Sequence, residues 1–267
     1  MNASDLALIR AAAIAAGEVA QAVRRKGLTT ISKADGTPVT TADLEVDALL
    51  KDQLTRARPD YGWLSEETAD DPIRLTRERL FVVDPIDGTR SYLKDRPWWA
   101  VSIAVVEAHR PVAGVVHAPD VAETYEAASG QGARLNGAPI APSGAAAIEG
   151  ASMLADAKLF AHPAWPEPWP AMRIESRNSI AYRLCLVACG AFDAALALSA
   201  KSEWDLAAAD LIATEAGCRV TTHRGRPFAY NGVVPRAPSL VCAGPALHRL
   251  ILRRVEPIEL GGETQSD

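Results

Sequence analysis

The feature that most constrains this chain is a short apolar run that ends in carboxylates. Residues 80 to 83 read LFVV, and the chain continues directly as DPIDGT, residues 84 to 89. An apolar run of this length, bounded by a turn, predicts a buried strand. A carboxylate at the end of such a strand loses hydration and repels its neighbour, so another group must offset that cost.

Pro85 and Gly88 determine how these carboxylates can be arranged. Proline fixes the backbone and glycine permits a sharp turn, so Asp84 and Asp87 can point into one small space. Carboxylate oxygens suit Mg²⁺, which also binds water and substrate phosphate. The amides of Gly88, Thr89 and the residues after them could hold a phosphate at the start of a helix. The segment therefore predicts a magnesium site that binds a phosphate.

The overall composition limits the classes of partner. The chain has 267 residues, of which 48% are hydrophobic and 23% charged, as is typical of a soluble globular protein. This length leaves both one large domain and two interlocked lobes open. The formal net charge of -5 argues against a surface that coats a nucleic acid polymer. A small anionic substrate requires a local site of positive potential.

The N-terminal segment resembles a secretion signal only superficially. Asp5, Arg10 and Glu18 interrupt its apolar run, and its basic cluster follows that run instead of preceding it. We therefore predict an alanine-rich surface helix over residues 3 to 26 and no membrane span. Four cysteines are too few for a disulfide framework. The expected compartment is the cytoplasm.

Helical and strand patterns alternate in both halves of the chain, which predicts a layered α/β architecture. A second helix should begin at Thr40 or Thr41, and a strand-rich block follows it. Composition shifts over residues 142 to 150, PSGAAAIEG, which marks a boundary between two lobes. In the second half, a helix is expected from about Leu206 to a stop at Gly217.

Acidic residues lie at the ends of four predicted elements. They are Asp43, the pair Glu66 and Glu67, the pair Asp84 and Asp87, and Asp205. Taken singly, an aspartate at a helix start usually caps the helix, and a Ser-Glu-Glu segment is usually a solvated loop. The DPIDGT segment has no such ordinary explanation.

These segments resemble the inositol monophosphatase superfamily of metal-dependent, lithium-sensitive phosphatases. The shared motifs are WLSEE, DPIDGT and EWDLAAADLIATEAG, in this order, with the glycine-rich segment GQGARLNGAPI between the second and third. The resemblance covers about residues 31 to 220. It implies a layered αβαβα fold in one domain, residues 1–267, with an α+β lobe over about 1–145 and an α/β lobe over about 146–267. It also implies a homodimer.

The resemblance assigns roles to individual residues. Glu66, Asp84 and the backbone carbonyl of Ile86 would bind one Mg²⁺, whereas Asp84, Asp87 and Asp205 would bind a second. Glu66 would also support a third, weaker ion through water.

The resemblance also assigns residues that act on the attacking water and on the substrate. Thr89 and Asp43 match the pair that orients and deprotonates the attacking water, so no covalent phosphoenzyme is expected. Gly88, Thr89, Asn178 and Ser179 would lie on the substrate side.

Two local features resemble the 3′(2′),5′-bisphosphate nucleotidase branch of this superfamily. One is the segment SKADGTPVTTAD, in which Lys33 stands ten residues before Asp43, and the other is EWD with the later PFAYN. Inositol-specific members carry a glutamate seven residues before the last metal aspartate, and this chain has Leu198 there. Leucine cannot accept hydrogen bonds from inositol hydroxyls. The resemblance thus favours hydrolysis of 3′-phosphoadenosine 5′-phosphate to AMP.

The sequence leaves several alternative functions open. Inositol-1-phosphate, histidinol phosphate and sugar phosphates are other candidate substrates. A non-catalytic binding protein that keeps the fold is disfavoured, because every metal ligand of the family pattern is present. In each case the expected partner is a small phosphorylated metabolite, without nucleic acid polymer or membrane.

Overall fold

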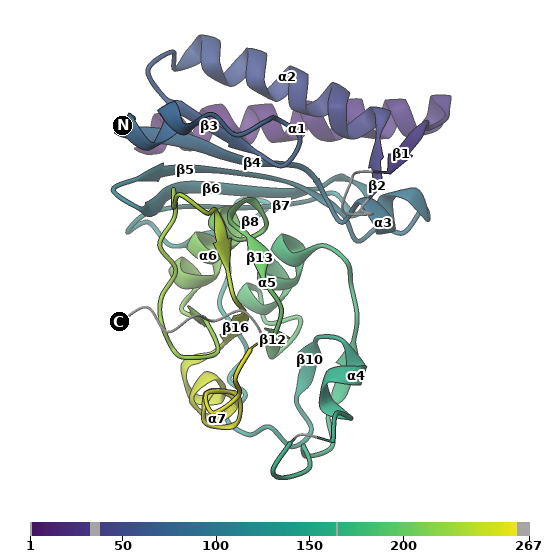
Figure 1. Ribbon diagram of the computed structural model, residues 1–267, viewed down its shortest axis with the longest axis vertical. Helices are drawn as coiled ribbons and strands as arrows, with labels where there is room; N and C mark the ends of the chain where they lie inside the picture. Colours follow the sequence, from purple (N-terminus) through teal and green to yellow (C-terminus); the bar gives the residue numbers. More distant parts are fainter. Residues whose placement is uncertain (1, 33–37, 164, 261–267) are drawn as a thin grey trace.

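The computed structural model describes residues 2–32, 38–163 and 165–260 and consists of five stacked layers (Figure 1). Two helices cover a large sheet, two further helices separate it from a smaller sheet, and a last helical layer covers the small sheet. The α/β fold and its αβαβα layering, expected from the resemblance, are confirmed. Lys33 lies outside the described residues.

The first helical layer consists of α1 (Asn2–Lys26) and α2 (Thr41–Ala57). Alanines on the buried side of α1 let it approach the large sheet closely: Ala12, Ala13, Ala16 and Ala20. Thr40 caps α2 as expected, in a capping box with Asp43. A small antiparallel hairpin, β1 (Thr30–Ser32) and β2 (Pro38–Thr40), leads into α2.

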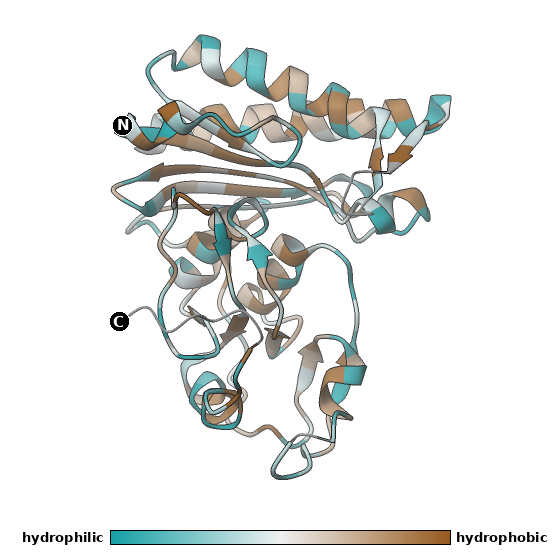
Figure 2. Ribbon diagram, viewed as in Figure 1, coloured by the Kyte–Doolittle hydropathy of each residue, from teal (hydrophilic) through white to brown (hydrophobic). Residues whose placement is uncertain are grey.

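The large sheet has its seven strands in sequence order, β3 to β9. The strands are β3 (Gly62–Ser65), β4 (Arg79–Asp87), β5 (Ala100–Glu107), β6 (Arg110–Ala118), β7 (Glu123–Ala128), β8 (Ala133–Leu135) and β9 (Ala138–Pro139). Strands β3 and β4 run parallel, and the other neighbours are antiparallel. Every residue of β4 is buried, because helices cover both faces of the sheet. The strands of this sheet are mainly hydrophobic, whereas hydrophilic and hydrophobic residues alternate along α2 on the outer surface (Figure 2).

Three short helices lie in the loops of this half. They are η1 (Pro72–Thr76), α3 (Thr89–Leu93) and η2 (Pro119–Val121). Of these, α3 follows β4 directly, so the end of the buried strand and the start of a helix lie at the same place.

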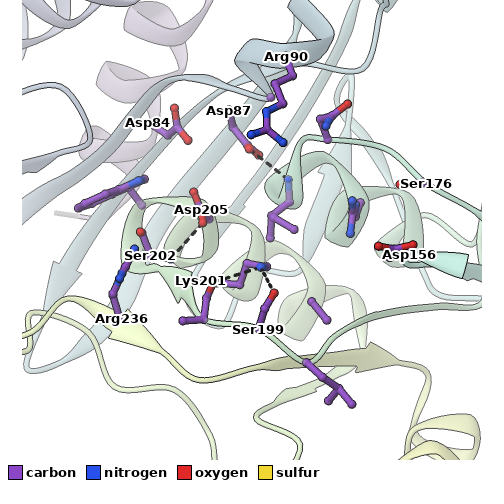
Figure 3. Close-up of a pocket in the computed structure, with 18 of the residues that line it drawn as sticks. Asp84, Asp87, Arg90, Asp156, Ser176, Ser199, Lys201, Ser202, Asp205 and Arg236 are labelled. Atoms are coloured by element: carbon purple, nitrogen blue, oxygen red, sulfur yellow. Dashed lines mark hydrogen bonds between the residues drawn. The ribbon is translucent and has the colours of Figure 1, made fainter. Parts of the chain in front are cut away.

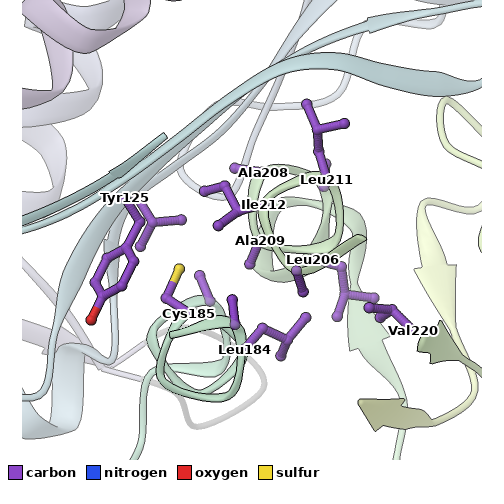
Figure 4. Close-up of a cluster of buried hydrophobic side chains, with 14 of the residues drawn as sticks. Tyr125, Leu184, Cys185, Leu206, Ala208, Ala209, Leu211, Ile212 and Val220 are labelled. Atoms are coloured by element: carbon purple, nitrogen blue, oxygen red, sulfur yellow. The ribbon is translucent and has the colours of Figure 1, made fainter. Parts of the chain in front are cut away.

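The middle layer consists of α5 (Ile180–Ala188) and α6 (Glu203–Ala216), which pack against each other and against the large sheet (Figure 4). Gly114 on β6 permits this contact, because a Cβ there would lie 2.9 Å from the carbonyl oxygen of Ala208. Cys185 is buried in this core. Helix α6 begins three residues earlier than the predicted Leu206, because Ser202 caps it with Asp205 in its first turn.

The small sheet has the strand order β11-β10-β12-β16-β14. Its strands are β10 (Ser152–Leu154), β11 (Arg173–Glu175), β12 (Ala194–Ala197), β14 (Arg219–Thr221) and β16 (Leu240–Ala243). Helices α4 (Ala157–Phe160) and α7 (Pro245–Val255) complete the outer layer. A separate two-stranded ribbon, β13 (Lys201–Ser202) with β15 (Arg236–Ala237), leads into α6.

Helix α1 is long and apolar. By length and composition alone, its part from Ser4 to Lys26 could cross a membrane. In this fold Ile9 and the alanines of α1 pack against the large sheet, and core helices of soluble proteins meet the same criteria. The absence of a membrane partner therefore stays a prediction, as does the division into lobes near residue 145.

Candidate active site

A cavity of about 1130 Å³ opens where β4 and α3 meet α5, α6 and the β13–β15 ribbon. Its lining combines carboxylates with several cationic side chains (Figure 3). The cavity lies between the large sheet and the small one, so both halves of the chain contribute to it.

Three carboxylates gather at one end of this cavity. Asp84, Asp87 and Asp205 each offer one oxygen, and these oxygens all lie within 4.8 Å of one another. In a regular strand Asp84 and Asp87 would point to opposite faces. The pairing of β4 with β5 is irregular between these two residues, and this irregularity lets both carboxylates reach one cluster. Figure 3 shows Asp205 facing them from α6.

Asp87 is held by the start of α5. Its carboxylate accepts hydrogen bonds from the Ser179 hydroxyl at 2.6 Å and from the amides of Ile180 and Ala181 at 3.1 and 2.6 Å. Burial nevertheless raises the pKa of Asp87 to about 6, because desolvation outweighs these three bonds. The carboxylate is therefore rigidly placed and short of positive charge.

The other two carboxylates have raised pKa values for similar reasons. Burial raises the pKa of Asp84 well above its usual range, and the charges of Glu66, Asp87 and Asp205 add to the effect. Burial and then the charges of Asp87 and Glu66 raise the pKa of Asp205 to about 8. Each accepts one backbone amide, Asp84 from Ile86 at 3.0 Å and Asp205 from Ser202 at 3.0 Å.

This donor set fits a divalent cation. Buried carboxylates that repel one another, without enough internal cations to compensate, are the environment that a hard cation stabilises. Glu66 lines the same cavity, and its charge acts on all three aspartates. The carbonyl of Ile86, predicted to be a ligand, accepts the Thr89 hydroxyl at 3.2 Å. The cluster could therefore bind a metal ion.

Thr89 and Asp43 lie beside this cluster. The Thr89 hydroxyl is 3.4 Å from one carboxylate oxygen of Asp43, while the other oxygen accepts the Thr40 amide at 2.8 Å and the Thr40 hydroxyl at 2.6 Å. Burial raises the pKa of Asp43 despite the bonds from Thr40. The structure thus brings together the two residues that the resemblance assigned to water activation, and one oxygen of Asp43 is available to Thr89.

The residues expected on the substrate side occupy different environments. Gly88 lines the cavity with a φ of 93°, and a Cβ there would lie 3.0 Å from the carbonyl oxygen of Trp98. Asn178 also lines the cavity, and its side-chain oxygen accepts the Ser91 hydroxyl at 2.9 Å. Ser179, in contrast, is buried outside the lining: its hydroxyl donates to Asp87 and accepts the Tyr182 amide at 3.0 Å.

Sequence reasoning overlooked the cationic residues of this cavity. It attributed positive potential only to backbone amides near Gly88, whereas Arg90, Lys158, Arg183, Lys201 and Arg236 all line the cavity. Lys201 stands four residues before Asp205, and this spacing was the available signal. Leu198 also lines the cavity, so the residue at the position of the inositol-specific glutamate does face the substrate space.

The chain is similar to known proteins along most of its length. A sequence model described as "Inositol monophosphatase family" matches residues 2–260. The 3′(2′),5′-bisphosphate nucleotidase CysQ of Aggregatibacter actinomycetemcomitans is 31% identical over 235 residues, covering 81% of this chain and 83% of that protein. A histidinol-phosphatase of Mycobacterium tuberculosis is 35% identical over 224 residues, covering 76% of this chain and 84% of that protein.

The fold has close counterparts among solved structures. An IMPase of Thermotoga maritima superposes with a TM-score of 0.81 at 25% identity, covering 94% of this chain and 96% of that chain.

Proposed function

The chain belongs to the inositol monophosphatase family and is a hydrolase of phosphate monoesters, and we propose that it removes the 3′-phosphate of 3′-phosphoadenosine 5′-phosphate to give AMP. The observation that carries the proposal is the convergence of Asp84, Asp87 and Asp205 at one end of a cavity that also holds the Thr89–Asp43 pair.

We assign the cofactor as Mg²⁺. Glu66, Asp84 and the Ile86 carbonyl would hold one ion, and Asp84, Asp87 and Asp205 a second, with a third held more weakly through Glu66. Bound divalent cations supply charge that neutralises phosphoryl oxygens and lowers the pKa of water.

The chain's own residues would position the reactants. Asp87 is fixed by α5 and Asp205 by its capping box, so the ligand oxygens are preorganised. The Thr89 hydroxyl would orient the attacking water, and Asp43 would receive its proton through that hydroxyl. A buried carboxylate with a raised pKa is the better proton acceptor, which suits Asp43 for this role.

The choice of substrate depends on the other end of the cavity. Leu198 offers no acceptor for inositol hydroxyls, and the 31% identical CysQ supports the nucleotidase branch. The 35% identical histidinol-phosphatase makes histidinol phosphate the second candidate. Inositol-1-phosphate and sugar phosphates are expected to be poorer substrates.

The test is a comparison of kcat/KM for 3′-phosphoadenosine 5′-phosphate, histidinol phosphate and inositol-1-phosphate at one Mg²⁺ concentration. We expect the highest kcat/KM for the nucleotide. A preference for either of the other substrates would overturn the assignment to the nucleotidase branch but not the assignment as a phosphatase. Absence of phosphate release from all three with Mg²⁺ would instead point to another phosphate monoester, such as a sugar phosphate, as the substrate.

We further propose that the protein acts as a homodimer in the cytoplasm. Sedimentation of the purified chain tests the first part, and fractionation of cells tests the second.

A further inference from the structure

Three cationic side chains line the active-site cavity beyond its acidic end. Lys201 comes from β13, Arg236 from the adjacent strand β15, and Arg183 from α5. Figure 3 shows Lys201 and Arg236 on the side of Asp205 away from Asp84 and Asp87. The cavity therefore has two chemically different ends, one acidic and one basic.

These cations have no carboxylate partners in the part of the chain that the structure describes. The Lys201 ammonium donates to the Ser199 hydroxyl at 2.8 Å and to the Ala200 carbonyl at 3.1 Å, both neutral groups. An ammonium has three donors, so one is left for a ligand. Arg183 donates to the carbonyl of Arg177, again a neutral acceptor. No ion pair within the described residues involves Lys201, Arg183 or Arg236.

The electrostatic environment supports this picture. Burial lowers the pKa of Lys201, the charges of Arg183 and Arg236 lower it further, and Asp205 and Asp87 oppose these effects. Cations that repel one another at a cavity wall gain stability from a bound anion. Asp156, a further carboxylate of the lining, caps the start of α4 and accepts the amide of Lys158 at 3.0 Å.

The cavity is also larger than a phosphate monoester group requires. Pockets for small ligands measure about 300–1,000 Å³, and this one measures about 1130 Å³. A substrate that reaches from the carboxylate cluster to Lys201 therefore has room for a second polar group.

We propose that Lys201, Arg183 and Arg236 form a second anion subsite, which binds a phosphate of the substrate that is not hydrolysed. The inference rests on the proposed function and defines the substrate class as small molecules with two phosphates. It disfavours histidinol phosphate, because a cationic amine would face three cations. For 3′-phosphoadenosine 5′-phosphate, the subsite would hold the 5′-phosphate.

The experiment removes the second phosphate from the substrate and, separately, a cationic side chain from the subsite. kcat/KM is measured for 3′-phosphoadenosine 5′-phosphate and for 3′-AMP, which lacks the 5′-phosphate, with the unaltered enzyme and with Lys201→Met and Arg236→Gln. The quantity compared is kcat/KM for 3′-phosphoadenosine 5′-phosphate divided by kcat/KM for 3′-AMP. This ratio should fall about 10-fold in each variant, because a charge-assisted hydrogen bond to the second phosphate is lost. Lys158→Met is the matched control, since Lys158 carries the same charge on another wall of the cavity.

The outcomes distinguish the subsite from the proposed function. A ratio that falls in both subsite variants and holds in Lys158→Met supports the subsite. A ratio that is unchanged in the subsite variants, or that falls equally in Lys158→Met, overturns it even when the nucleotide remains the best substrate. If the unaltered enzyme does not hydrolyse the nucleotide more efficiently than inositol-1-phosphate, the result counts against the proposed function instead.

Discussion

The hydroxyl of Ser179 donates a 2.6 Å hydrogen bond to the carboxylate of Asp87, and the two residues are 92 positions apart in the sequence. The same hydroxyl accepts the Tyr182 amide and so caps α5. Ser179 therefore connects the end of β4 to the start of a helix in the other half of the chain.

This connection predicts the effect of Ser179→Ala. The variant should lose about 1–2 kcal/mol of stability, because it removes both a helix cap and a buried hydrogen bond to a carboxylate. It should also require more Mg²⁺ for half-maximal activity, since Asp87 is less firmly placed. Thermal unfolding and Mg²⁺ titration of activity measure the two effects, and Ser179→Thr, which keeps the hydroxyl, is the control. An unchanged Mg²⁺ requirement would show that the backbone amides of Ile180 and Ala181 hold the Asp87 carboxylate in place without the Ser179 hydroxyl.

Asp84→Asn tests the metal arrangement. Asp84 is assigned to both ions, so turnover should fall on the order of 100-fold or more while the fold is retained. The metal-free variant should unfold at a higher temperature than the metal-free parent, because one charge leaves a cluster of mutually repelling carboxylates. Near-normal turnover at saturating Mg²⁺ would contradict the shared-ligand assignment.

Thr89 and Asp43 should behave as one unit in water activation. Thr89→Ala removes an orienting hydroxyl but no metal ligand, so kcat should fall about 100-fold with little change in the Mg²⁺ requirement. Asp43→Asn should have a similar effect, and the double variant should lose much less than the product of the two. Thr89→Ser is the control that retains the hydroxyl. Losses that multiply independently would argue against a relay.

The stability of the metal-free protein should decrease as pH rises above about 6.5. Asp205 has a folded-state pKa of about 8, raised above its unfolded value, so the folded state binds the extra proton and stability falls as pH rises toward 8. Below pH 6.5, His248, whose pKa burial lowers to about 4, acts in the opposite direction. Melting temperatures in chelator from pH 6.5 to 8.5 measure the slope, and Asp205→Asn should flatten it. A slope that the variant leaves unchanged would assign the effect to other groups.

Lithium should inhibit the enzyme, as the family resemblance implies. Li⁺ would occupy a metal position after hydrolysis and delay release of the product. Phosphate release at moderate Mg²⁺ should decrease as LiCl is added, with NaCl at equal ionic strength as the control. Full activity in excess Li⁺ would count against the proposed metal arrangement.

The sequence was most informative where chemistry restricts the choice of residue. The resemblance of DPIDGT and EWD to the motifs of a known family implied a common site, and the structure brings Asp84, Asp87 and Asp205 together. The five-layer fold was implied by the same resemblance and is confirmed.

Other features depend on tertiary contacts that no local pattern reveals. The irregular pairing within β4 arises from its alignment with β5, and the bond from Ser179 to Asp87 exists only after α5 has packed. Lys201 reads as an ordinary solvated lysine until the ribbon with Arg236 places it at the cavity. The start of α6 was placed too late, because the capping role of Ser202 was overlooked.

The origin of the three clustered aspartates has a consequence for refolding. Asp84 and Asp87 belong to the large sheet, whereas the α5 amides and Asp205 come from helices that lie between the two sheets. A chain that has formed only β3 to β9 would hold Asp87 without the donors of α5, and Asp84 with only the amide of Ile86. Recovery of phosphatase activity after dilution from denaturant should therefore follow the docking of the second half of the chain onto the first, and should lag behind formation of the large sheet.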